Sequence, residues 1–173
     1  MRKNVLLDAA ESLLSEQGTQ ALTLAAVADR AGVSKGGLLY HFPTKEALVQ
    51  ALVSRVIEDF DDLIGSFIDD SPGSYTRAYV RATFEILTGE ARAYRRWSAI
   101  MAAATDPELA APLNAAMRRW HGHVDPTDPD PEGTALVRLA AEGLWEVVSH
   151  APGLYEEKQF AALEARMLKL LER

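Results

Sequence analysis

The sequence predicts an all-α fold of about nine helices, and three observations support this prediction. Apolar residues recur at three- and four-residue intervals, the spacing of an amphipathic helix, along most of the 173 residues. Glycines, prolines and helix-capping residues divide the chain into segments of helical length. No segment shows the alternation of apolar and polar residues that marks a half-buried strand. A chain of this length forms one domain or two small domains that share a core.

The first two predicted helices are amphipathic. Apolar residues from Val5 to Leu14 predict the first helix, and Gly18 stands where a left-handed residue ends such a helix. Thr23 can cap the second helix, because its hydroxyl can accept a hydrogen bond from a free backbone N–H. This helix ends after two turns at Gly32. Its apolar stripe consists of Leu24, Val27, Ala28 and Ala31.

The third helix is predicted to be short and the fourth long. Ser34 caps the third helix, which runs to about His41. It ends there because Pro43 disfavours helical geometry at Phe42. Thr44 caps the fourth helix. The long apolar face of this helix consists of Leu48, Leu52, Val56, Phe60, Leu63, Ile64 and Phe67.

Five further helices are expected in the rest of the chain, separated by glycine and proline. Pro72-Gly73 makes the first break. Asp106-Pro107 is expected to start a helix, because proline suits a first turn. An acidic loop with three prolines is expected over residues 125–133. The expected helices span about 75–87, 92–104, 106–123, 134–150 and 155–171.

Composition excludes several classes of protein. The absence of Cys excludes disulfides and thiolate metal sites and suits a cytoplasmic protein. No apolar run approaches the roughly 20 residues that span a membrane, and early acidic residues argue against a signal peptide. The net charge of -7 argues against nonspecific nucleic-acid binding by the whole surface. The acidic excess lies in residues 51–173, since residues 1–50 are neutral overall, which indicates different partners for the two parts.

Two short helices joined by a tight turn form a helix-turn-helix, whose second helix enters the DNA major groove by its N-terminal part. Gly36 and Gly37 each cost a helix about 1 kcal/mol relative to Ala, but they let the backbone approach another surface closely. Lys35 can reach a phosphate or a guanine edge, and Lys45 lies near exposed amides that attract phosphate. The same segment also fits a protein that never contacts DNA, with Tyr40 in the core and both lysines solvated.

Residues 22–48 resemble the DNA-binding region of the TetR family of transcriptional repressors. The similarity extends nearly end to end over the segment AAESLLSEQGTQALTLAAVADRAGVSKGGLLYHFPTKEALVQAL. It covers about the first 50–60 residues, whereas the rest of the chain resembles the family in architecture only. The resemblance implies a DNA-binding domain over residues 1–47 and a helical effector-binding and dimerisation domain over residues 48–173.

The resemblance also implies that the third helix reads bases. The residues expected nearest to bases or adjacent phosphates are Lys35, Gly36 and Tyr40. Those expected to hold the DNA backbone are Thr23, Ser34, His41 and Lys45. Two further positions of this set depart from the family pattern, since Gly37 stands where Thr is frequent and Leu39 where Tyr is frequent. These departures remove two hydroxyl contacts to phosphate. Leu39 lies either in the core or against a thymine methyl group, whereas Phe42 and Leu38 are expected in the core.

A regulator of this family is a dimer that reads the two half-sites of a near-palindrome. Segment 134–150 is apolar around more than one face, so it must pack on its own domain and on something else. Ala140, Ala141 and Gly143 allow a close helix approach. The resemblance therefore implies a homodimer through the last two helices, and the alternative is a monomeric helical core.

The middle helices are expected to hold a pocket for a small-molecule effector, because aromatic side chains with a few polar groups commonly line such pockets. Arg95-Arg96 and Arg118-Arg119 suit an anionic effector, whereas the acidic residues on either side of Phe60 suit a cation. These indications are opposed, so both effector charges stay open. The candidate lining residues are Phe60, Ile64, Phe67, Tyr79, Phe84, Trp97, Met101, Met117, Trp120 and Trp145.

No metal site, cofactor or enzymatic activity is expected. His121 and His123 do not share a helix face. Glu142, Glu146 and His150 do share one, and this spacing favours surface pairing over a metal site or polar network. The motifs G-x-S-x-G and H-E-x-x-H and the P-loop are absent. The sequence predicts a ligand-responsive DNA-binding repressor, and the alternative is a helical protein-interaction module without DNA binding.

Overall fold

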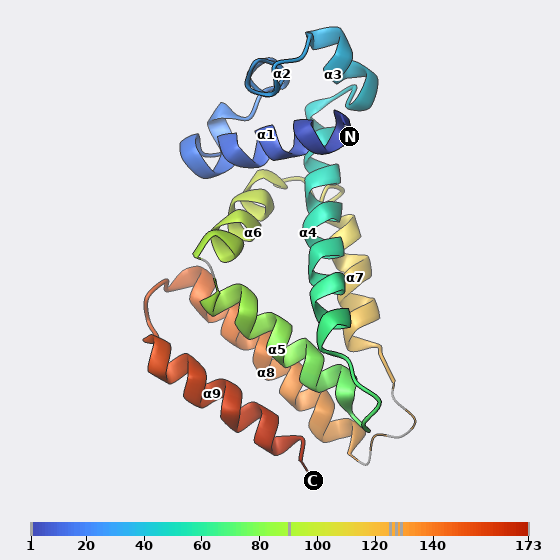
Figure 1. Ribbon diagram of the computed structural model, residues 1–173, viewed down its shortest axis with the longest axis vertical. Coiled ribbons are helices and arrows are strands. Elements are labelled where there is room, and N and C mark those ends of the chain that lie inside the picture. Colours follow the sequence, from blue (N-terminus) through green and yellow to red (C-terminus); the bar gives the residue numbers. More distant parts are fainter. Residues whose placement is uncertain (1, 90, 125, 127, 129, 173) are drawn as a thin grey trace. The chain divides into compact units, whose positions relative to one another are not determined.

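The computed structural model describes residues 2–89, 91–124, 126, 128 and 130–172. These residues form nine α-helices, a short 3-10 turn at Thr19–Ala21 and no strand, which confirms the predicted fold class. None of the described helices is long and apolar enough to cross a membrane. The helices are α1 (Arg2–Gln17), α2 (Leu24–Ala31), α3 (Lys35–His41), α4 (Lys45–Phe67), α5 (Ser74–Thr88), α6 (Ala91–Ala103), α7 (Ala111–His121), α8 (Pro131–His150) and α9 (Glu157–Leu170) (Figure 1).

Three predicted helix caps are confirmed. The hydroxyls of Thr23, Ser34 and Thr44 each accept a hydrogen bond from the backbone N–H three residues later, at 3.1 Å. Gly32 ends α2 with φ 65° and ψ 32°, a left-handed conformation that a Cβ disfavours. These local interactions explain why α2, α3 and α4 begin where the sequence predicts.

The predicted start of the seventh helix at Asp106-Pro107 is wrong, because α7 begins at Ala111. The Asp106 carboxylate accepts a hydrogen bond from the Glu108 N–H at 2.9 Å, which favours a turn. Pro112 supplies a second reason. Inside a longer helix it would lack a required N–H donor and clash with the carbonyl four residues earlier. At the second position of α7 no helical hydrogen bond needs its N–H, and no helical carbonyl lies four residues earlier.

The eighth helix also begins at a different residue from the predicted one. α8 starts at Pro131, ahead of the predicted Thr134. Asp130 caps it by accepting a hydrogen bond from the Gly133 N–H at 3.0 Å, and proline suits its first position. Residues 125, 127 and 129 of the predicted acidic loop lie outside the described residues.

The chain forms two compact units. The first contains the residues up to Glu58 together with Arg95–Ala116, and the second contains Asp59–Tyr94 together with the residues from Met117 onward. Helices α4 and α7 therefore contribute to both units. The functional division at residue 47 that the family resemblance implies stays a prediction.

In the first unit, α1 packs against α2 and α2 against α3. Arg30 of α2 donates to both carboxylate oxygens of Glu16 in α1, at 3.0 and 2.9 Å. Arg96 of α6 donates through Nε and Nη2 to the two oxygens of Glu11 in α1, at 2.7 and 2.8 Å. Both pairs are bidentate, and the first joins consecutive helices whereas the second joins helices that are distant in sequence. The buried apolar residues of this unit include Leu6, Leu13, Leu22, Val27, Leu38, Phe42 and Leu48.

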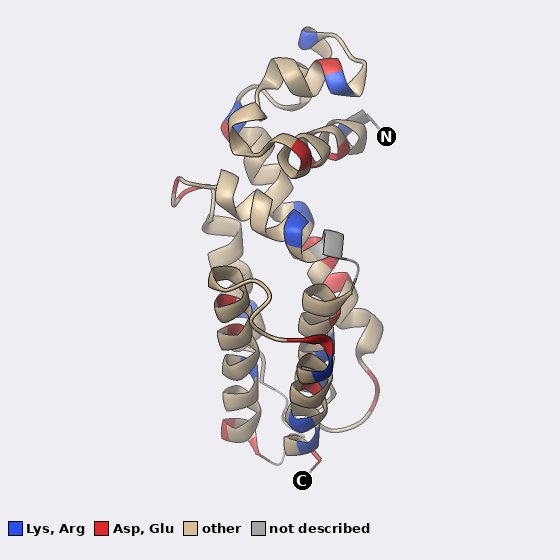
Figure 2. Cartoon of the chain, turned by 90° about the vertical axis from the view of Figure 1, so that its left-hand side faces the viewer, with Lys and Arg blue, Asp and Glu red and all other residues tan. Residues whose placement is uncertain are grey.

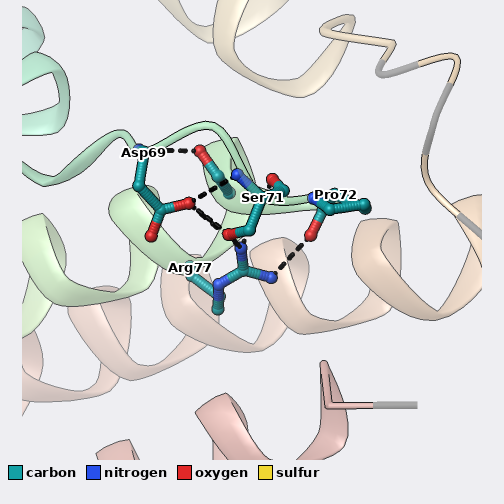
Figure 3. A network of polar contacts seen from close by, with 5 residues as sticks. Asp69, Ser71, Pro72 and Arg77 are labelled. Carbon is teal, nitrogen blue, oxygen red and sulfur yellow. Dashed lines mark hydrogen bonds and ion pairs between the residues drawn. The ribbon is translucent and has the colours of Figure 1, made fainter.

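In the second unit, α5 packs against both α8 and α9 (Figure 1). The connection from α4 to α5 is ordered by its own polar contacts (Figure 3). Asp69 accepts a hydrogen bond from the Ser71 N–H at 2.9 Å, and Arg77 donates to the Pro72 carbonyl at 2.7 Å. The apolar core of this unit includes Tyr79, Val80, Phe84, Val137, Ala141 and Leu144.

Candidate nucleic-acid interface

Helices α2 and α3 form a helix-turn-helix around Gly32. The Val33 N–H donates to the Ala28 carbonyl at 3.0 Å, and the Gly32 N–H donates to the Asp29 carbonyl at 3.2 Å. The turn thus satisfies carbonyls at the end of α2. Ala28 and Leu38 are buried, so the apolar sides of both helices face the core of their unit.

The opposite side of α3 is exposed. Tyr40 is 85% exposed and Leu39 is 36% exposed, so neither belongs to the core. Phe42 is buried at 2% exposure, and Leu38 is buried too, as predicted. Leu39 is therefore accessible to an apolar group such as a thymine methyl. Tyr40 presents a hydroxyl and a ring to any partner of α3.

The two glycines leave part of this exposed side without side chains. A Cβ at Gly36 would meet no atom within 4 Å, whereas a Cβ at Gly37 would lie 3.3 Å from the Ser34 Oγ. Packing within the protein therefore does not require glycine at position 36. Glycine would be required at position 36 if the surface of a partner molecule approached the backbone closely there.

The remaining predicted contacts lie at helix ends. The hydroxyls of Thr23 and Ser34 cap their helices as acceptors, which leaves each hydroxyl proton free to be donated to a phosphate. Lys45 is exposed at the first residue of α4, where backbone N–H groups lack helical partners. Hydrogen bonds from its own backbone and from the Thr44 hydroxyl hold the pKa of Glu46 below its usual value, so a negative charge stands beside Lys45.

His41 is less accessible than Tyr40. It is half-buried, and its ring lies edge-on to the Tyr40 ring with centroids 5.1 Å apart. It also borders a hollow of about 310 Å³. The other residues around this hollow are Leu6, Gly32, Val33, Ser34 and Gly37.

The helix-turn-helix is not a large basic surface. Charged residues of both signs are interspersed in this part of the chain (Figure 2). Arg30 is held by Glu16, whereas Lys35 is exposed. A partner of this motif would therefore meet a few exposed side chains and bare backbone in place of a large basic surface.

The ten residues expected to line an effector pocket divide between the two units. Trp97 and Met101 belong to the first unit and the other eight to the second. The Phe60 ring lies edge-on to those of Tyr79 and Trp120, with centroids 5.5 and 5.0 Å apart. These three rings are buried and form an aromatic cluster. An effector pocket at these residues stays a prediction.

One acidic and one basic residue that indicated opposite effector charges pair with each other. Asp61 accepts a hydrogen bond from the Trp120 Nε1 at 2.7 Å and pairs with Arg119. The acidic and basic runs are thus partly neutralised within the protein. Glu146 and His150 form an exposed pair at 3.5 Å, as predicted. The same prediction is wrong for Glu142, which is half-buried and accepts a hydrogen bond from the Tyr79 hydroxyl of α5.

Sequence reasoning missed a polar cluster inside the second unit. Arg138 of α8 is 6% exposed and donates to the Thr76 hydroxyl of α5 at 2.6 Å. One turn further along α8, Glu142 accepts a hydrogen bond from the Tyr79 hydroxyl. Burial, with the nearby Glu142 carboxylate, raises the pKa of Tyr79 above its usual value. The helical register of α8 was the available signal, because it places Arg138 on the same side as the buried Thr134, Val137, Ala141 and Leu144.

The sequence of this chain matches two protein-family models. "Bacterial regulatory proteins, tetR family" matches residues 6–52, and "Tetracyclin repressor-like, C-terminal domain" matches residues 73–172. The regulator BetI of Serratia proteamaculans is 30% identical over 149 residues, which cover 83% of this chain and 75% of BetI. The repressor KstR2 of Rhodococcus jostii is 35% identical over 91 residues, which cover 50% of this chain and 39% of KstR2.

Solved structures show the same fold. A TetR-family member from Streptomyces coelicolor superposes with a TM-score of 0.76 at 21% identity and covers 100% of this chain and 99% of its own. The multidrug-binding protein EbrR, complexed with ethidium, superposes with a TM-score of 0.71 at 22% identity and covers 96% of this chain and 98% of its own.

Proposed function

The chain belongs to the TetR family of helix-turn-helix transcriptional regulators, which bind DNA and are not enzymes, and we propose that it is a ligand-responsive repressor in the cytoplasm. In this proposal a homodimer binds a near-palindromic operator. The observation that carries it is the asymmetry of α3. Its apolar side is buried around Leu38, while Lys35, Gly36 and Tyr40 are exposed on the other side.

The proposed DNA contacts follow from this asymmetry. Lys35, Gly36, Gly37, Leu39 and Tyr40 meet bases or adjacent phosphates, and residues at the helix ends hold the backbone. The backbone-holding residues are Thr23, Ser34, His41 and Lys45. Base contacts specify sequence, whereas phosphate contacts fix the register of the protein on the duplex.

The proposed dimer uses α8 and α9. Leu136, Leu139 and Val147 of α8 are 67, 58 and 40% exposed, and Ala140 and Gly143 between them are exposed as well. Their spacing places all five on one helix face. A second copy of the chain would cover this apolar stripe, and small residues would allow the helices to approach closely. Two recognition helices about 34–36 Å apart would then fit successive major grooves.

The proposed effector binds in the second unit and acts through α4. This helix starts at Lys45, beside the helix-turn-helix, and continues through Phe60 to Phe67 in the second unit. An effector that prefers one position of α4 would shift the population of DNA-binding dimers. An effector that strengthens DNA binding fits the same linkage. EbrR, with ethidium bound, shows that a protein of this fold can hold a small molecule.

Selection from a random duplex library on the pure protein, at about 0.15 M salt, tests the proposed function. Recovery of one near-palindromic sequence is the expected result. The variants Lys35→Ala and Lys45→Ala should then weaken binding to that sequence, each with a smaller dependence on salt. A pool without any preferred sequence, together with binding that ignores both substitutions, would favour the helical protein-interaction module instead.

A further inference from the structure

Arg138 is a buried cation whose hydrogen-bond partners are neutral. Its Nη1 donates to the Thr76 hydroxyl at 2.6 Å, and its Nη2 lies 3.5 Å from the carbonyls of His121 and His123. Its Nε is buried without a hydrogen-bond partner. Among the described residues no carboxylate forms an ion pair with it. Burial of a charge without a counterion is unfavourable. An anion that paired with this guanidinium would therefore stabilise it.

Arg96 shows what that partner would be. Its Nε and Nη2 form the edge that holds both oxygens of Glu11, at 2.7 and 2.8 Å. In Arg138 the same edge has an unpartnered Nε and only the two long carbonyl contacts of Nη2. A planar carboxylate matches this edge with two parallel hydrogen bonds. The geometry of Arg138 is therefore that of half a bidentate pair.

The surroundings of Arg138 suit a carboxylate attached to an apolar group. The Tyr75 ring stacks on the His123 ring with centroids 3.7 Å apart. His121 has a buried Nε2 without a hydrogen bond, 3.7 Å from the Glu142 carboxylate. Glu142 is itself occupied by the Tyr79 hydroxyl, and the Tyr79 ring belongs to the aromatic cluster of Phe60 and Trp120. An incompletely paired cation, Arg138, therefore lies in the same unit as several aromatic side chains.

We propose that the effector is an apolar carboxylate and that Arg138 holds its carboxylate group. This inference rests on the proposed function and assigns a negative charge to the effector. A bound carboxylate would take the Nε–Nη2 edge and replace the two long contacts, to His121 at the end of α7 and to His123 just beyond it. Binding would then loosen the attachment of α7 to α8, which gives the ligand a route to change the protein.

The test is calorimetric titration of the full chain with 1-naphthoate, its neutral amide 1-naphthamide, and inorganic phosphate. The wild type should bind naphthoate and neither of the other two. Arg138→Met should weaken naphthoate binding at least about tenfold, since it removes a charged hydrogen-bonded pair. Arg166→Met serves as the matched control, because it makes the same exchange at an exposed arginine of α9 and should leave the affinity unchanged.

Circular dichroism establishes that each variant is folded, and Arg138→Lys replaces Arg138→Met if the latter is not. Naphthoate binding that is equal in the wild type and the Arg138 variant would overturn the inference, as would no binding at all. Arg138 would then only tie α5 and α7 to α8. Binding of phosphate alone would overturn the assignment to a carboxylate. Operator selection needs no anion, so a protein that selects an operator but ignores naphthoate refutes this inference and leaves the repressor intact.

Discussion

The exposed sides of α3 and α8 have opposite chemistry. On α3 the solvent meets a lysine, two glycines and a tyrosine that is 85% exposed. On α8 it meets Leu136 and Leu139, which are 67 and 58% exposed. Hydroxyl, ammonium and bare backbone suit phosphates and base edges, whereas an apolar stripe suits another apolar surface. This difference supports the proposal that the chain uses two docking surfaces for two kinds of partner, DNA at α3 and a second copy of the chain at α8.

The two helices also differ in how they are stabilised. A helix of seven residues with two glycines is not stable by itself, so α3 depends on the Ser34 cap and on buried Leu38. The 20 residues of α8 include many strong helix formers. The glycines lower the stability of α3, which is the expected cost if DNA approaches this backbone closely as proposed.

The largest effect is expected from a charge in the middle of the α8 stripe. Leu139→Asp should weaken dimerisation at least about 100-fold, because the dimer would bury an unpaired carboxylate. Operator affinity should fall with it, while the monomer stays folded because Leu139 is exposed. Sedimentation velocity measures the association. Val124→Asp is the control, since Val124 is 78% exposed outside α8. An unchanged dimer in Leu139→Asp would remove α8 from the interface.

The next effect separates neighbouring aromatic residues of the recognition segment. Tyr40→Ala should reduce operator affinity about tenfold without lowering stability. Phe42→Ala should lower the free energy of unfolding by about 3–5 kcal/mol, because Phe42 is buried. Fluorescence anisotropy with labelled operator and thermal unfolding measure the two quantities. A stability loss in Tyr40→Ala, with normal DNA binding, would reverse the roles assigned to the two residues.

A smaller change is expected at Gly36, where one substitution should raise stability and lower operator affinity. Gly36→Ala should stabilise the protein by about 0.5 kcal/mol, because the added methyl meets no atom and the unfolded chain loses freedom. The same methyl should weaken operator binding about threefold or more if DNA approaches this backbone. Chemical denaturation and anisotropy on one protein sample measure both. Improved stability with unchanged DNA affinity would show that the DNA does not come close to position 36.

The smallest effect concerns the pair that holds α1 to α2. Hydrogen bonds from Arg30 and then Ser12 lower the pKa of Glu16 from 4.5 to about 2. A lowered folded-state pKa contributes stability above the unfolded value, and this contribution is lost as the pH falls from about 4.5 towards 2. Glu16→Gln should therefore be slightly less stable than the wild type at neutral pH, and the difference should vanish near pH 2. Thermal unfolding at several pH values measures it, and a constant difference would contradict the assignment.

Features that depend on neighbours within a few residues could be predicted from the sequence. The caps at Thr23, Ser34 and Thr44, and the end of α2 at Gly32, arise from hydrogen bonds and backbone preferences that span three or four residues. The buried side of α3 follows from helical spacing around Leu38. The resemblance to the TetR family also lies in this local pattern, and both family matches agree with it.

The pairing of charges that are distant in sequence could not be predicted, because it depends on how the helices pack. Arg96 pairs with Glu11 across 85 positions, and Arg119 with Asp61 across 58, whereas spacing indicated only runs of like charge. Helical register could place Arg138 on the buried side of α8, but not beside a hydroxyl 62 positions away and without a carboxylate. Local sequence fixes which side of a helix is buried, since that depends on its own periodicity. The packing of other helices fixes what a buried charge meets there, and in the second unit that leaves Arg138 without an acidic partner among the described residues.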